Sequence, residues 1–201
     1  MNKPMNFRIL ALSLALAGGL GAGGAALAQS SAVKQVVPPS AIASQNITEA
    51  QVLAAQRAWG EALVQISKDY EAGGIAKAKA TASSVIDSAY GYQYGPVLFK
   101  PTLTVAPQTF RTTREGALAY FVGDDKAYPD DQGFALKGWR SVEIRNAAIQ
   151  LHGDTALSMG NVILTDKAGK VTTVDKTWGY MRDDQGNLRI VLHHSSLPVT
   201  R

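Results

Sequence analysis

The stretch Ser141-Val142-Glu143-Ile144-Arg145-Asn146-Ala147-Ala148-Ile149-Gln150-Leu151 decides the fold of this chain. Apolar residues alternate with polar ones up to Ile144 and again from Ile149, which is the pattern of a half-buried strand, but the two halves are in opposite phases. An extra residue near Asn146, a β-bulge, changes the buried face in this way and bends the strand. The stretch therefore predicts a long strand in a curled sheet.

Three further strands follow, since apolar runs are separated by turns at Gly153-Asp154, at Lys167-Ala168-Gly169 and at Asp184-Gln185-Gly186-Asn187. Strands that are joined in sequence by tight turns pair antiparallel, so we predict a meander. A shorter strand is expected at 97–104, and Pro101 within it indicates a sheet edge or a bulge.

Helical spacing of apolar residues marks the chain before this sheet. Thr48 with Gln51 forms a capping box that begins a first helix, and Gly73-Gly74 ends it. A second helix begins at Ile75 and breaks at Gly91, and a short third one over 114–122 follows a capping threonine, Thr112 or Thr113. Helices followed by a curled antiparallel sheet predict an α+β fold, in which the helices cover the concave face and leave a pocket.

Residues 1–28 read as a secretory signal peptide. Lys3 and Arg8 precede an uncharged apolar stretch, and Ala26-Leu27-Ala28 supplies the small residues of a cleavage site. We expect cleavage after Ala28, a periplasmic or secreted protein and no membrane attachment afterwards, while an uncleaved anchor stays open. A flexible linker rich in Ser, Pro and Gln is expected over 29–46, and one folded domain over 47–201.

Composition excludes several kinds of site. The chain has no cysteine, so thiolate metal sites and cysteine nucleophiles are ruled out. Its formal charge of +4 includes Lys3 and Arg8, which leaves about +2 after cleavage, too little to predict a nucleic-acid partner.

Two of the three histidines stand in the ending His193-His194-Ser195-Ser196, after an apolar run. Strand alternation turns His193 and Ser195 to one face, and His194 and Ser196 to the other. The second pair is expected to form hydrogen bonds at the back of the sheet or at a subunit contact. The first pair is either a hydrogen-bonded strand end or part of a site, because an unpaired buried polar group costs about 1–3 kcal/mol.

The order of elements is also that of the cone-shaped α+β barrel of the SnoaL-like and nuclear transport factor 2-like superfamily. The ending resembles the last strand of the calcium/calmodulin-dependent kinase II association domain. Three motifs together are similar to the iota class of carbonic anhydrases, over about residues 48–198: Val97-Leu98-Phe99-Lys100-Pro101-Thr102, then Thr113-Arg114-Glu115-Gly116-Ala117-Leu118-Ala119-Tyr120-Phe121-Val122-Gly123, then the HHSS ending.

This resemblance implies a catalytic domain that hydrates CO₂ reversibly to bicarbonate and a proton. It also implies that Thr102, Tyr120, His193 and Ser195 line one small pocket that holds bicarbonate. Hydroxyl donors from Thr102, Tyr120 and Ser195 suit the charge that develops on the substrate oxygens. With an ordinary pKa near 6.5, His193 is the expected proton acceptor.

Iota-class members are described both with and without a metal, so zinc is an alternative cofactor. His193 and His194 diverge onto opposite faces, and His152 stands at a hairpin corner of unknown relation to the pocket. We therefore favour a site without any cofactor. If a metal is bound, we expect His193 among its ligands.

Two other functions stay open: a non-catalytic small-ligand-binding or scaffold module of the same fold, and an isomerase or cyclase of the SnoaL kind. An isomerase needs a carboxylate base, which the matched pocket positions lack. Arg140, Arg145 and Lys176 either attract bicarbonate or are exposed strand residues. Because the outer face of the sheet still carries large apolar residues, we expect a homodimer.

Overall fold

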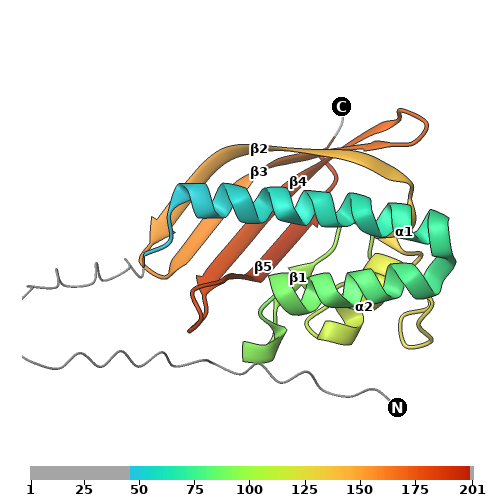
Figure 1. Ribbon diagram of the computed structural model, residues 1–201, viewed down its shortest axis with the longest axis horizontal. Coiled ribbons are helices and arrows are strands. Elements are labelled where there is room, and N and C mark those ends of the chain that lie inside the picture. The colour runs from blue at the N-terminus through green and yellow to red at the C-terminus, as the bar shows by residue number, and fades with distance from the viewer. Residues whose placement is uncertain (1–45, 200–201) are drawn as a thin grey trace, which may run out of the picture. The chain divides into compact units, whose positions relative to one another are not determined.

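The computed structural model describes residues 46–199, whose arrangement Figure 1 shows. The predicted signal peptide, and the predicted linker except Asn46, lie outside the described residues. The elements are α1 (Glu49–Ala89), η1 (Tyr92–Tyr94), β1 (Leu98–Lys100), α2 (Arg114–Val122), η2 (Phe134–Leu136), β2 (Trp139–His152), β3 (Thr155–Asp166), β4 (Val171–Arg182) and β5 (Leu188–Ser196).

The five strands form one sheet in the order β1-β5-β4-β3-β2. Strands β2 to β5 pair antiparallel, which confirms the meander, and β1 adds to its edge parallel to β5. The register shifts between Asn146 and Ala148, so the predicted bulge is confirmed. Gly160 faces this bulge, and a Cβ there would lie 2.1 Å from the Arg145 carbonyl oxygen. The bulge therefore requires glycine on the neighbouring strand.

The first two predicted helices are confirmed as the two arms of α1, which double back at Gly74 (Figure 1). Both hydrogen bonds of the Thr48–Gln51 capping box are present. Gly74 has φ 68° and ψ −164°, a conformation that interrupts a helix and that few residues other than glycine adopt. The second arm ends at Ala89, which places Tyr90 directly after it.

Strand β1 is shorter than the expected 97–104. It ends at Lys100, because Pro101 cannot donate a backbone hydrogen bond to the ladder. Strand β1 lies at the edge of the sheet, which confirms one of the two positions that Pro101 predicted. Helix α2 begins after Thr113, whose side chain accepts a hydrogen bond of 3.2 Å from the Gly116 N–H.

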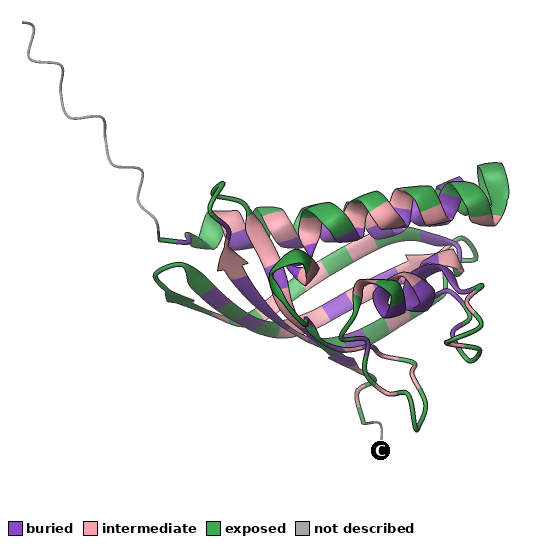
Figure 2. Cartoon of the chain, turned by 90° about the horizontal axis from the view of Figure 1, so that it is seen from below, coloured by how far each residue is buried: buried purple, intermediate pink, exposed green. Residues whose placement is uncertain are grey.

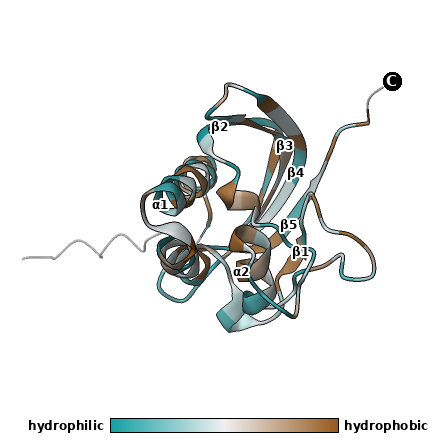
Figure 3. Ribbon diagram, turned by 90° about the vertical axis from the view of Figure 1, so that its right-hand side faces the viewer, coloured by the Kyte–Doolittle hydropathy of each residue, from teal (hydrophilic) through white to brown (hydrophobic). Residues whose placement is uncertain are grey.

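The core lies between the helices and the concave face of the sheet, as the end-on view of Figure 3 shows. In Figure 2 the buried residues of both layers face each other. Trp139, Trp178 and Tyr180 are all within this core. Among the described residues, no helix has the length and apolar character that a membrane crossing requires.

Candidate active site

Strand β5 carries two of the predicted site residues on its concave side. His193 and Ser195 are buried, whereas His194 between them is exposed. The alternation predicted for the HHSS ending is therefore confirmed. His152 is also exposed, at the end of β2.

Thr102 and Tyr120 reach the same place from other elements. Thr102 follows β1, which pairs with β5, and its Oγ1 donates a hydrogen bond of 2.6 Å to Ser195 Oγ. Tyr120 comes from α2, and within residues 46–199 its hydroxyl has no hydrogen-bond partner. Burial raises the pKa of Tyr120, while the Thr102 hydroxyl and the backbone of Thr102 and Leu103 lie near enough to lower it without reaching hydrogen-bond geometry. This side chain therefore stays a neutral hydroxyl donor at ordinary pH.

A narrow recess with about 170 Å³ of free space is lined by Thr102, Tyr120 and His193, and Ser195 contacts it through its hydrogen bond with Thr102. Its walls are mostly aromatic, and the Phe99 ring stacks on the His193 ring at 4.3 Å between centroids. The recess is too narrow for a water-sized sphere as these side chains stand, so even a very small ligand needs small side-chain movements to enter. A wider groove between α1 and β2, with about 1290 Å³ of free space, contains none of the four predicted residues.

Both ring nitrogens of His193 have partners. Nδ1 lies 2.8 Å from the Tyr90 hydroxyl, and Nε2 lies 2.6 Å from Lys176 Nζ. The Tyr90 hydroxyl also accepts a hydrogen bond of 3.0 Å from Trp59 Nε1. Burial, together with the nearby Lys176, lowers the pKa of His193 well below its ordinary value. The pKa near 6.5 on which its expected role rested therefore does not hold, and the imidazole is neutral.

Lys176, which the sequence named only with Arg140 and Arg145 as a residue that attracts bicarbonate or is exposed, also lines the recess. It is 4% exposed, so the interpretation as an exposed strand residue is wrong. Its place on the concave face follows from alternation with the buried Val174 and Trp178, a signal already present in the sequence. Burial lowers the pKa of Lys176 to about 7.

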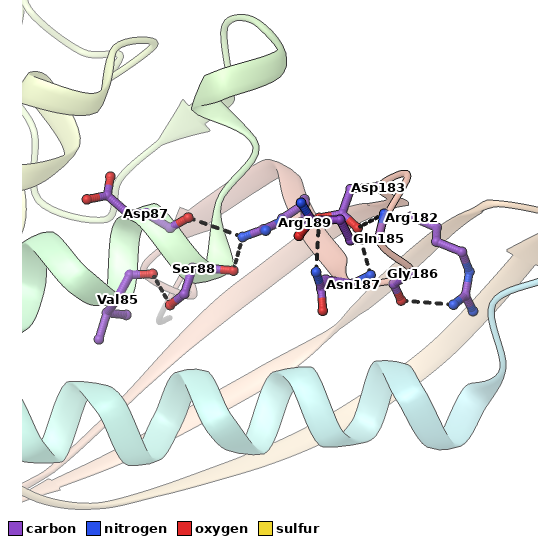
Figure 4. A network of polar contacts seen from close by, with 9 residues as sticks. All are labelled: Val85, Asp87, Ser88, Arg182, Asp183, Gln185, Gly186, Asn187 and Arg189. Carbon is purple, nitrogen blue, oxygen red and sulfur yellow. Dashed lines mark hydrogen bonds and ion pairs between the residues drawn. The ribbon is translucent and has the colours of Figure 1, made fainter. Parts of the chain in front are cut away.

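The C-terminal end of α1, directly before Tyr90, is hydrogen-bonded to the β4–β5 hairpin (Figure 4). Arg189 donates to the carbonyl oxygens of Asp87, at 3.1 Å, and Ser88. Its Nε also donates to the Asp183 carboxylate at 2.8 Å. A backbone hydrogen bond of 3.0 Å from Gly91 to Ile190 continues this connection. The hairpin thus helps to hold Tyr90 against His193.

Comparison with known proteins shows the family of this chain. The family model for metal-independent carbonic anhydrases matches residues 50–197. The chain belongs to this family. A metal-independent carbonic anhydrase of Nostoc sp. (strain PCC 7120 / SAG 25.82 / UTEX 2576) is 69% identical over 157 residues, which are 78% of this chain and 77% of the relative.

Solved structures of relatives extend the comparison. The crystal structure of a cyanobacterial iota-carbonic anhydrase complexed with bicarbonate is 68% identical to this family member, with a TM-score of 0.79 over 80% of this chain and 98% of that one. A putative calcium/calmodulin-dependent protein kinase II association domain from Xanthomonas campestris, at 23% identity and a TM-score of 0.50, covers 77% of this chain and 91% of that one. The second likeness shows the fold alone.

The described residues of this member of the metal-independent carbonic anhydrase family offer no set of side chains that would bind zinc. Within residues 46–199, no group of three or more His, Asp or Glu side chains is placed to hold a metal ion. The one buried histidine of the recess has an amine at Nε2 and a hydroxyl at Nδ1. The zinc alternative is therefore not supported by the chemistry of these side chains.

Proposed function

We propose that this chain hydrates CO₂ reversibly to bicarbonate and a proton, without a metal, at the recess lined by Thr102, Tyr120 and His193, where Ser195 pairs with Thr102. One observation carries this assignment: the buried Tyr120 hydroxyl has no partner among the described residues, and it lines the recess beside the hydrogen-bonded Thr102–Ser195 pair. Leaving such a hydroxyl unpaired costs about 1–3 kcal/mol, which a bound oxygen would offset.

The recess suits the charge changes of this reaction. CO₂ is linear and apolar, so aromatic walls accommodate it, whereas the transition state is bent and carries negative charge on its oxygens. Hydroxyl groups that are already in position stabilise this charge without reorganising. The bicarbonate in the crystal structure of the 68% identical relative supports the same substrate here.

A stopped-flow assay of CO₂ hydration on the mature chain, after exhaustive removal of metal, tests the function. We expect hydration well above the uncatalysed rate, with bicarbonate as the product. A chain that binds bicarbonate but does not speed hydration would instead be the non-catalytic binding module.

The outer face of the sheet supports a homodimer as the working form. Leu98, Leu157 and Met159 are 62%, 46% and 58% exposed on this face. The register aligns Leu98 with Leu192, Gly179 and Leu157 in one row across four strands. A two-fold axis would pair this row with its copy and remove it from water. Light scattering should give a dimer, and Met159→Glu should shift it towards monomer.

We also propose that the chain is exported and cleaved after Ala28. This proposal rests on the basic start, the apolar stretch and the small residues before Gln29. N-terminal sequencing of the protein from a periplasmic fraction should find Gln29 first. A first residue upstream of Ala28 in the mature protein would contradict this cleavage site.

A further inference from the structure

The hydrogen-bond chain Trp59–Tyr90–His193–Lys176 has a direction. An indole N–H can only donate, so the Tyr90 oxygen accepts from Trp59 Nε1 at 3.0 Å. The Tyr90 proton is then left for His193 Nδ1, at 2.8 Å. The opposite direction would place two donors on the Tyr90 oxygen and leave its own buried proton without an acceptor in the chain.

This direction determines the state of Lys176. Since Nδ1 accepts, the neutral imidazole of His193 carries its proton on Nε2. Nε2 lies 2.6 Å from Lys176 Nζ, so the amine must accept. An ammonium has no lone pair, whereas a neutral amine has one. The geometry therefore indicates a neutral Lys176 in the resting site.

The surroundings of Lys176 also accommodate its charged form. Its Nζ lies 4.8 Å from the Trp59 ring centroid and 5.5 Å from that of Trp178, and aromatic faces at such distances attract a cation. The titratable groups around the amine are His193 from β5, Tyr90 after α1 and Tyr120 from α2. Within residues 46–199 no carboxylate forms an ion pair with it.

We propose that Lys176 takes the proton of the attacking water in CO₂ hydration and returns it in dehydration, while His193 and Tyr90 are positioning residues that hold its amine at the recess. This proposal rests on the function proposed above. The water oxygen forms the new bond to the carbon of CO₂, and one C=O electron pair moves to oxygen. One O–H bond of the water breaks, and its proton goes to the lone pair of Nζ. The products are bicarbonate and the Lys176 ammonium, which then gives the proton to solvent.

Two features suit Lys176 to this step better than His193. To take the proton, the amine gives up its hydrogen bond from Nε2–H, and the resulting ammonium lies over the two indole rings. Its pKa, lowered by burial to about 7, allows both directions of the reaction at neutral pH, because an acid or base works best when its pKa is near the working pH. The pKa of His193 is lowered too far for that.

The test compares Lys176→Met with Lys170→Met, a matched change at an exposed lysine in the β3–β4 hairpin. Loss of a general base slows a reaction by about 10²–10⁴-fold, so Lys176→Met should lose at least 100-fold in kcat while the variant stays folded at the assay temperature. Lys170→Met should keep the full rate. Small amine buffers should partly restore Lys176→Met and should not affect Ser195→Ala.

The pH profile gives a readout that a purely structural lysine would not move. Hydration by the unaltered chain should fall as the pH drops below about 7, because the amine becomes protonated. Tyr90→Phe frees the His193 tautomer to accept from an ammonium, so this acid limb should move to higher pH. ¹⁵N NMR of Lys176 Nζ in the unaltered chain should show titration near neutrality, whether or not the variants fold.

The outcomes separate the two proposals. If the unaltered chain does not hydrate CO₂, the proposed function fails. If it does, and Ser195→Ala is slow while Lys176→Met keeps its rate and acid limb, the recess is correct and the role of Lys176 is wrong. A Lys176 Nζ that stays charged up to pH 10 also overturns that role.

Discussion

Thr102 and Ser195 are 93 positions apart in the sequence, yet Thr102 Oγ1 donates a hydrogen bond of 2.6 Å to Ser195 Oγ. The parallel pairing of β1 with β5 makes this contact, because it aligns Lys100 with His194 just before the two hydroxyls. Because Ser195 Oγ accepts this hydrogen bond, its own proton is not used in the bond between the pair.

Thr102→Val and Ser195→Ala should therefore each slow CO₂ hydration. Loss of one well-placed donor costs about 10²–10³-fold in rate. Because the two hydroxyls act as one pair, the double variant should lose much less than the product of the single losses. Stopped-flow rates of the three variants measure this coupling, and a fully multiplicative loss would show that the hydroxyls act independently.

Tyr120→Phe should reduce the rate by about 10²–10³-fold without lowering the melting temperature, since the deleted hydroxyl has no partner among the described residues. Tyr180→Phe is the matched control. Its hydroxyl is also buried and unpartnered in the described part of the chain, but Tyr180 is not among the residues that line the recess. Equal losses of activity in the two variants would contradict the assigned site.

Removal of metal should leave hydration unchanged. Each ring nitrogen of His193 already has a partner, and residues 46–199 offer no cluster of metal-ligating side chains. Elemental analysis should find well under one zinc per chain, and chelation should not reduce the rate. Activity that is lost on chelation and returns with one equivalent of Zn²⁺ would reverse this expectation.

Stability should fall in acid through Asp183. Burial raises the pKa of this carboxyl, but Arg189 and the Asn187 backbone and side chain outweigh it and lower the pKa to about 2. An unfolded aspartate has a pKa of about 3.9, so these contacts stabilise the fold above that pH and are lost as the pH falls toward 2. Urea unfolding at several pH values should show this decline. Asp183→Asn should flatten it, whereas the exposed Asp184→Asn should not.

Much of the fold could be predicted, because local patterns cause it. The capping box at Thr48, the break at Gly74 and the bulge after Asn146 each depend on a few neighbouring residues. Alternation also placed His193 on the opposite face from His194. The length of β1 was overestimated, since Pro101 ended the strand where a continuing bulge was also possible.

The partners of His193 could not be predicted in the same way. The amino-acid order specified the strands, the turns and which side chains share a face, because these follow from the periodicity of one segment of chain. The environment of Lys176 depends instead on β5 lying beside β4, on Trp59 from α1 and on Tyr90 directly after α1. Burial among these residues lowers the pKa of Lys176 to about 7. Desolvation is a property of the assembled core, so no single segment of the sequence could predict it.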